Sequence, residues 1–372
     1  MRAPVLVAAA LALAACSSPS GPKPAELQRL EKPQEVRVLW SARIGDADRF
    51  VFFPAPVGDA VFAAARDGTV VRLDAAKRGA ERWRVTLEKR LSAGVAANEG
   101  TVVVATEDGD VFALSAADGK QRWRSRVSSE VLAPAALASG LVIVRSVDNR
   151  IFAFDEQDGK RRWVYQRAPA SLIVRSPAGV TVVGETAFAG FSGGKLAAIA
   201  LSNGGVRWES TVAVPKGATE LERVTDVVGE PVVQGREVCA AAYQGRVACF
   251  DMASGRQVWT RELSSLTGVA VDARYAFVSD DRGSVHELDR TNGRSVWKQD
   301  KLAYRQLSIP APVGNVVAVG DLEGYVHFLS RESGAFVARY SSGGGPVRAA
   351  PLALASSVLI QTQDGTLVAL AL

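Results

Sequence analysis

Short apolar and β-branched runs, each bounded by turn residues, recur along the chain, as at residues 101–105 and 111–114. Their positions follow a period of two, which is typical of β-strands, whereas an amphipathic helix would place apolar residues at i, i+3, i+4 and i+7. Pairs such as Asp108-Gly109 and Gln244-Gly245 separate neighbouring runs, and glycine adopts the positive φ that tight hairpins require. The pattern predicts an all-β protein of short antiparallel strands.

These strands belong to a longer repeat. The segment DGDVFALSAADGKQRW, which ends at Trp123, recurs as DNRIFAFDEQDGKRRW, which ends at Trp163. Six tryptophans close matching units at intervals of 38 to 51 residues: Trp83, Trp123, Trp163, Trp208, Trp259 and Trp297. That interval is typical of a four-stranded propeller blade.

Eight units can be counted from their openings, which place proline or glycine ahead of a small or β-branched residue. The openings are Pro56, Gly94, Pro134, Pro177, Pro231, Gly268, Pro312 and Pro351. The eighth unit supplies only three strands, and residues 36–40, which include Trp40, precede the first opening. Residues 36–372 are therefore predicted to form an eight-bladed β-propeller of four-stranded antiparallel blades, closed by the N-terminal strand pairing with the C-terminal blade. The seventh unit has Ala338 where the others have tryptophan, so we expect a weaker blade contact there.

The closing motif, as at residues 153–163, resembles the tryptophan-docking motif of quinoprotein-like eight-bladed propellers. The resemblance implies that each indole packs on the neighbouring blade. Quinone-dependent (PQQ) dehydrogenases share this fold, but they carry an adjacent pair of cysteines and long insertions over the active site, which this sequence lacks. Because a shared fold does not carry shared chemistry, we expect no enzymatic activity and no cofactor. A propeller-type sensor that binds a ligand in the central channel is the other alternative.

The N-terminus has the features of a bacterial lipoprotein signal. A short basic start precedes an apolar run too brief to span a bilayer, and Leu13, Ala14 and Ala15 lie ahead of Cys16. We expect residues 1–15 to be a signal peptide, Cys16 to be the acylated first residue, and residues 16–35 to form a flexible tether rich in proline and serine. Ser17 in place of aspartate is similar to lipoproteins sorted to the outer membrane. The expected location is the periplasmic face of the outer membrane.

Other chemistry is sparse. The net charge of +5 is spread through the closing strands and does not form the basic patch of a nucleic-acid-binding protein. His286 and His327, the only histidines, hold equivalent positions in successive units, which are usually too far apart to share a metal. With no histidine elsewhere, Ser-His-Asp and Cys-His systems lack a base. No catalytic or metal site is therefore predicted.

Cys239 and Cys249 flank a hairpin around Gln244 and Gly245. A three-residue turn would place the two cysteines opposite one another, and a two-residue turn would stagger them. An oxidising compartment permits a disulfide between them. The alternative is that both are small buried apolar residues.

Two connectors between units are longer than most and are expected to be neighbours on one face of the propeller, where insertions in repeat proteins often bind partners. The first contains Leu172, Val174 and Arg175, and the second contains Glu222, Arg223 and Asp226. Apolar residues with a charged rim are typical of a protein-binding hot spot. The alternative is that Leu172 and Val174 tuck beneath the loop.

Taken together, the lipoprotein signal, the eight blades, residues 219–227 and residues 321–327 resemble the BamB family, lipoprotein subunits of the outer-membrane β-barrel assembly (BAM) machinery. The resemblance implies a non-catalytic scaffold that binds the periplasmic POTRA domains of BamA and assists the insertion of outer-membrane β-barrel proteins. Leu172, Val174, Arg175 and Asp226 match the family's BamA-facing positions, and Val228 departs from relatives that carry a second acid there. Whether nascent outer-membrane β-barrel proteins bind directly stays open.

Overall fold

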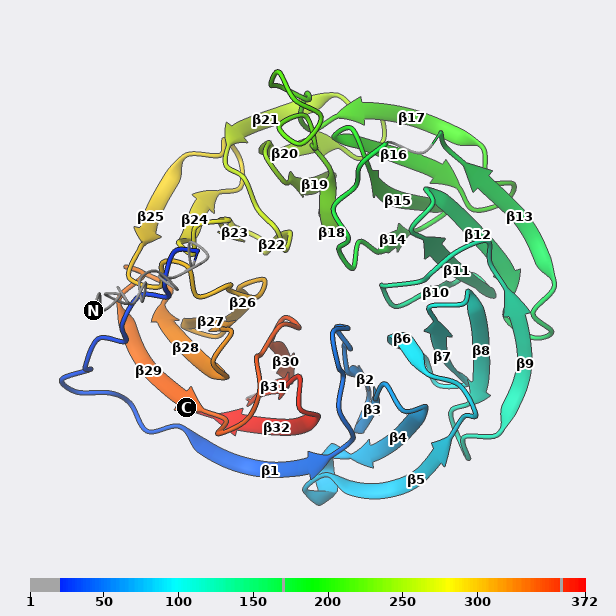
Figure 1. Cartoon of the computed structure of the whole chain (residues 1–372), viewed down its shortest axis with the longest axis horizontal. Helices are drawn as coiled ribbons and strands as arrows, with labels where there is room; N and C mark the ends of the chain where they lie inside the picture. The colour runs from blue at the N-terminus through cyan, green and yellow to red at the C-terminus, as the bar shows by residue number, and fades with distance from the viewer. Residues whose placement is uncertain (1–20, 169–170, 355–356) are drawn as a thin grey trace, which may run out of the picture.

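The computed structural model describes residues 21–168, 171–354 and 357–372, and Cys16 and the signal peptide lie outside these ranges. Eight antiparallel sheets of four strands each are arranged in a ring around a common axis (Figure 1). In seven of them the strands run from the centre outward in chain order. The predicted eight-bladed β-propeller is confirmed. Within the described residues no helix is long and apolar enough to cross a membrane.

Blades one to four contain β2 (Ala55–Val57), β3 (Ala60–Ala64), β4 (Thr69–Asp74) and β5 (Ala80–Thr86); β6 (Leu91–Ala97), β7 (Thr101–Thr106), β8 (Asp110–Ser115) and β9 (Gln121–Arg126); β10 (Ala136–Ala138), β11 (Leu141–Ser146), β12 (Arg150–Asp155) and β13 (Arg161–Gln166); and β14 (Val180–Val183), β15 (Thr186–Phe191), β16 (Lys195–Ala200) and β17 (Val206–Thr211). A single 3-10 turn, η1 (Ala75–Lys77), links β4 and β5.

Blades five to eight contain β18 (Val227–Gln234), β19 (Glu237–Ala242), β20 (Arg246–Asp251) and β21 (Gln257–Glu262); β22 (Val269–Val271), β23 (Tyr275–Ser279), β24 (Val285–Asp289) and β25 (Ser295–Gln299); β26 (Ala311–Val313), β27 (Val316–Gly320), β28 (Tyr325–Ser330) and β29 (Phe336–Ser341); and β30 (Leu352–Leu354), β31 (Ser357–Gln361), β32 (Thr366–Ala371) and the N-terminal β1 (Arg37–Arg43).

The ring closes as predicted. Strand β1 pairs antiparallel with β32, so that Trp40 lies opposite Ala369 and Arg43 opposite Thr366. The contact continues past the strands, because the amide of Ile44 donates to the carbonyl of Gly365 at 2.8 Å. The two ends of the propeller thus complete one blade (Figure 1), and the outer edge of β32 is not left open.

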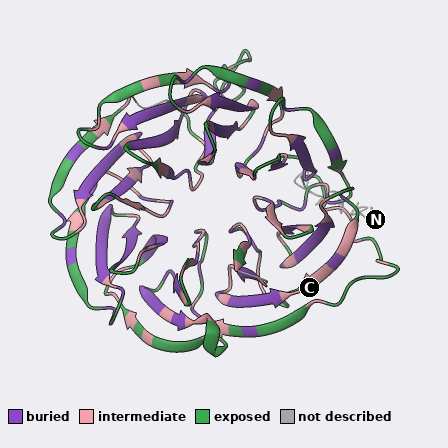
Figure 2. Cartoon of the chain, turned by 180° about the vertical axis from the view of Figure 1, so that it is seen from behind, coloured by how far each residue is buried: buried purple, intermediate pink, exposed green. Residues whose placement is uncertain are grey.

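Burial explains why the repeat has its particular pattern. The middle strands are sandwiched between neighbouring blades and are buried on both faces, as in β7, where all six residues are buried. The outer strands face solvent on one side, so in β9 only Trp123 is buried (Figure 2). Middle strands therefore read as nearly continuous apolar runs, and outer strands as polar runs interrupted by one tryptophan.

Each tryptophan docks against a glycine turn of the next blade. Trp123, for example, packs so closely on Gly159 that a Cβ added there would lie 2.6 Å from the indole Cδ2. The indole nitrogen also donates to the carbonyl of Glu156 at 2.9 Å. The same packing joins seven pairs: Trp40 with Gly79, Trp83 with Gly119, Trp123 with Gly159, Trp163 with Gly204, Trp208 with Gly255, Trp259 with Gly293, and Trp297 with Gly334. All seven predicted tryptophans therefore join neighbouring blades.

The N-terminal segment differs from the expected tether. Residues 25–34 lie along the outer side of blade seven, where the amide of Ala25 donates to the carbonyl of Ala303 at 2.8 Å and that of Gln34 to Val337 at 2.9 Å. The side chain of Leu27 packs on the apolar cluster of Leu302. A flexible tether over all of residues 16–35 is therefore wrong for residues 25–34, because specific contacts hold them on the propeller.

Candidate partner-binding site

Two long connectors meet on one face of the ring. Connections from the outer strand of one blade to the inner strand of the next emerge at the same end of the strands as the turns between the two middle strands. We call this side the connector face. Residues 167–179 join β13 to β14, and residues 212–226 join β17 to β18. The predicted neighbourhood of these connectors is confirmed by a direct contact between them.

Asp226 makes that contact. One carboxylate oxygen accepts a hydrogen bond from the amide of Val174 at 2.6 Å, and the other accepts one from Gly193 at 3.3 Å. The residue is only 5% exposed, and burial raises the pKa of its carboxyl against the opposing effect of these two hydrogen bonds. The sequence led us to expect Asp226 at the surface that faces the partner. In the structure its carboxylate is turned inward and holds the first connector in place.

Arg145 lies beneath the same contact and was not anticipated from the sequence. Its guanidinium donates to the carbonyl of Ala178 at 2.8 Å and lies 5.5 Å from the ring centre of Phe191. Burial lowers its pKa to about 10, and the charge of Asp226 acts in the opposite direction. Asp226 and Arg145 thus form a charged support under the connector, and no local motif in the sequence indicated it.

The surface above this support is apolar. Leu172 is 48% exposed and Ile173 is 41% exposed on the first connector, and Leu221 is 71% exposed on the second. Val174 is half-buried and lines a small hollow with Asp226. Leu172 therefore does not tuck beneath the loop, and Val174 does so in part. Ile173 and Leu221 are exposed as well, and no motif in the sequence singled them out.

Arg175 reaches back across this face. Its guanidinium pairs with Glu130, with Nε 3.0 Å from the carboxylate, and lies 5.6 Å from the ring centre of Phe50. About half of the side chain stays exposed. Arg175 is thus held in a defined orientation beside Leu172 while keeping part of its surface available.

Glu222 and Arg223 occupy the tip of the second connector. The Glu222 carboxylate accepts hydrogen bonds from the amides of Ala218 and Thr219 at 2.8 and 3.0 Å. Those hydrogen bonds lower its pKa. The amide of Arg223 donates to the carbonyl of Thr219 at 3.2 Å, and both side chains are exposed. Glu222 therefore shapes the turn that displays Leu221.

The remaining candidates lie elsewhere. Cys239 and Cys249 stand directly opposite one another across a three-residue turn and are joined by a disulfide. The side chains of His286 and His327 each contact an aspartate of their own blade, Asp280 and Asp321, at 2.9 Å. Across the described ranges, no cluster of three or more histidine, cysteine or acidic residues could hold a metal ion.

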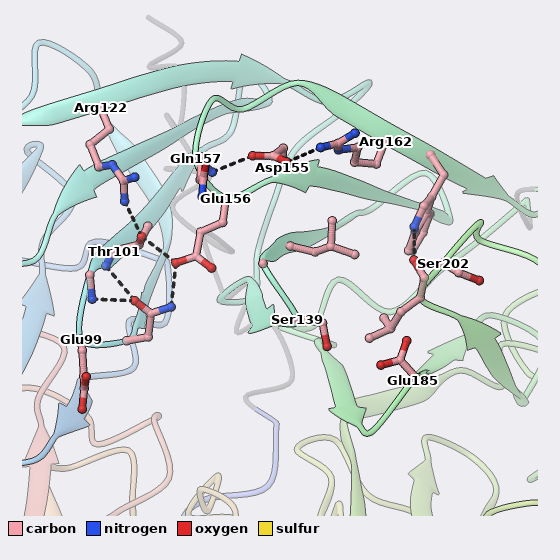
Figure 3. A pocket seen from close by; sticks show the side chains of 16 residues that line it. Glu99, Thr101, Arg122, Ser139, Asp155, Glu156, Gln157, Arg162, Glu185 and Ser202 are labelled. Atoms are coloured by element: carbon pink, nitrogen blue, oxygen red, sulfur yellow. Dashed lines mark hydrogen bonds and ion pairs between the residues drawn. The ribbon is translucent and has the colours of Figure 1, made fainter.

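A groove of about 1000 Å³ lies on the opposite face, among the turns of blades two to four. Several of its polar and charged groups are already paired within the chain, as Figure 3 shows: Thr101 donates to Glu156 at 2.7 Å, Arg122 donates to Thr101 at 2.8 Å, and Arg162 donates to Asp155 at 2.5 Å. Such pairing is typical of structural ion networks. The groove does not present a nucleophile next to a base.

Comparison with known proteins agrees with the eight-bladed propeller. The family model described as "Outer membrane protein assembly factor BamB" matches residues 66–299. The chain is 42% identical to the assembly factor BamB of Bordetella pertussis, over 99% of this chain and 96% of that protein. It is 44% identical to BamB of Pseudomonas aeruginosa, over 98% and 97%.

Solved structures give the same result. The crystal structure of BamB from Moraxella catarrhalis matches with a TM-score of 0.84 and 28% identity, covering 91% of this chain and all of that one. A quinohemoprotein alcohol dehydrogenase from Comamonas testosteroni matches with a TM-score of 0.70 but 12% identity, covering 90% of this chain and 76% of that one, which shows the shared fold alone. The chain belongs to the BamB family of outer membrane protein assembly factors.

Proposed function

We propose that this protein is a non-catalytic scaffold of the outer-membrane β-barrel assembly machinery. It binds the periplasmic POTRA domains of BamA through the two joined connectors and so assists the insertion of outer-membrane β-barrel proteins. The observation that carries the proposal is the exposed pair Leu172 and Ile173 beside Arg175, on a connector that Asp226 holds in place. The second connector adds the exposed Leu221. An apolar centre with a charged rim is the usual composition of a protein-binding hot spot.

The location belongs to the same proposal. Acylation of Cys16 would anchor the chain at the periplasmic face of the outer membrane, since several acyl chains on one residue are enough for stable attachment. The Cys16→Ala variant is then expected in the soluble fraction of cells that lack BamA.

A titration of BamA POTRA domains tests the surface. Arg175→Glu and Leu221→Asp are each expected to weaken binding at least tenfold, which corresponds to about 1.4 kcal/mol, because the first reverses a charge on the first connector and the second replaces an exposed apolar side chain of the second connector by a charge. Neither position is buried, so both variants should stay folded. Arg175→Glu also loses the ion pair with Glu130, which for an exposed pair is worth at most about 1 kcal/mol, so its melting temperature should fall by no more than about 2 °C.

Arg236→Glu is the matched control. Its side chain is 89% exposed and lies at the turn between β18 and β19, on the face opposite the connectors. Wild-type affinity for Arg236→Glu together with a loss for Arg175→Glu supports the proposed surface. Wild-type affinity for both Arg175→Glu and Leu221→Asp would refute it.

A further inference from the structure

The N-terminal segment is held on blade seven by a preformed charged cluster. Arg305 is only 2% exposed, and its Nε donates to Asp321 at 2.7 Å while Nη2 pairs with Glu323. Its remaining nitrogen, Nη1, donates to the carbonyl of Ala25 at 2.8 Å. The backbone of the segment therefore completes the hydrogen bonding of a buried cation.

A second arginine holds the segment farther along. Nη1 of Arg339 donates to the carbonyl of Gln28 at 2.9 Å, and its Nε contacts His327, which also contacts Asp321. Leu27 lies between these two anchor points and packs on Leu302. Two backbone hydrogen bonds, from Ala25 to Ala303 and from Gln34 to Val337, fix the two ends.

The direction of the segment follows from these partners. Ala303 belongs to the connector between β25 and β26 and lies on the connector face, whereas Val337 lies near the start of β29, at the opposite face. Residues 25–34 thus cross the outer side of blade seven from the connector face to the other face. The chain then enters β1 (Figure 1).

We propose that residues 25–34 act as a strap that fixes the point from which the lipid-bearing end leaves the propeller, so that the connector side of blade seven faces the phospholipid surface. This inference rests on the proposed acylation of Cys16. Ala25 follows Cys16 by nine positions, and a chain spans at most about 3.5 Å per residue, so this edge stays within about 30 Å of the membrane. The anchor and the candidate BamA surface then share one face.

Hydrogen exchange of the purified soluble domain tests the strap itself. The amides of Ala25 and Gln34 are expected to exchange at least about tenfold more slowly than unstructured amides. Leu27→Asp places a charge in the apolar contact and should remove that protection. The control Glu31→Ser changes an exposed position of the same segment and should keep it. Free exchange of both amides in the wild-type protein overturns the strap.

Fluorescence quenching on vesicles tests the orientation. Ser341→Cys and Ser333→Cys place labels near the two ends of β29, on the connector face and on the opposite face. With the acylated protein on phosphatidylethanolamine and phosphatidylglycerol vesicles that carry a nitroxide lipid, the label at position 341 should be quenched at least about twofold more than that at 333. Leu27→Asp should bring the ratio towards one, and Glu31→Ser should not.

Equal quenching of the two labels in the wild-type protein overturns the membrane-facing orientation. Failure of the acylated protein to sediment with vesicles is a different result, because it refutes the proposed lipid anchor and with it the orientation, while the exchange experiment still decides the strap.

Discussion

The docking of tryptophan on glycine gives a sharp prediction for Gly159→Ala. The φ of Gly159 is +71°, and an added Cβ would lie 2.6 Å from Cδ2 and 2.7 Å from Cε3 of Trp123. A left-handed conformation costs a non-glycine residue about 1–2 kcal/mol, and overpacking adds about 1–3 kcal/mol. Gly159→Ala should therefore destabilise the protein by roughly 2–5 kcal/mol.

Gly140→Ala is the matched control in the same blade. Its φ is +72°, and nothing lies within 4 Å of an added Cβ, so this variant should show only the conformational cost. Thermal unfolding monitored by circular dichroism should place Gly159→Ala at least about 2 °C below Gly140→Ala, since about 2 °C corresponds to 1 kcal/mol in a large domain. In a Trp123→Ala background the difference between the two glycine variants should shrink to the contribution of Ser125, whose Oγ would lie 2.8 Å from the added Cβ. Equal melting temperatures in the wild-type background would mean that the indole moves aside at little cost, and would refute the steric reasoning.

Two further predictions concern the core and the closure. Glu287 is 1% exposed, and neither of its carboxylate oxygens has a hydrogen-bond partner among the described residues; burial raises its pKa to about 7 against the charge of Arg331. Because the pKa in the folded state lies above the unfolded value, folding favours the neutral carboxyl, and stability is lost as the pH rises towards and through 7. Glu287→Gln should therefore raise the melting temperature at pH 8 and leave it nearly unchanged at pH 5. Equal effects at both pH values would contradict this. The second prediction concerns ring closure: a chain that begins at residue 44 should melt at least about 6 °C below one that begins at residue 37. The shorter chain lacks β1 and the buried Trp40, and burial of a tryptophan alone is worth about 3–5 kcal/mol. Melting temperatures within about a degree of each other would show that β1 is dispensable.

The fold was predictable because its repeating contacts join residues of the same unit or of the next unit along the chain. One tryptophan, one glycine turn and two apolar middle strands per unit were enough to establish the blade and to count eight of them. The closure of the ring was predictable because the unpaired N-terminal strand supplies the one strand that the incomplete eighth unit lacks. The register at Cys239 and Cys249 depended on the length of one turn, which the sequence left open and the structure gives as three residues.

The candidate site was less predictable because it depends on contacts between connectors. The position of Asp226 in the chain did not indicate that its carboxylate would turn inward to Val174 and Gly193. Nor did the polar composition of residues 16–35 indicate that residues 25–34 would be held, since the buried arginine that binds them, Arg305, is distant in sequence. Composition predicts whether a segment can form its own core; it does not predict whether a distant side chain will bind its backbone.

The seam between blades seven and eight shows why one tryptophan is absent. Ala338 pairs with Phe328 in the same register that pairs Trp163 with Ala153, so a tryptophan at position 338 would point towards blade eight. For six tryptophans the carbonyl that accepts from the indole comes from the turn between the third and outer strands of the next blade. In blade eight those strands are β32 and β1, which no turn connects. An indole there would lack both the glycine and the carbonyl, and a buried donor without a partner costs about 1–3 kcal/mol. Alanine at position 338 is thus the consequence of closing the ring with the two ends of the propeller, so the departure in the seventh unit and the incomplete eighth unit have one physical cause.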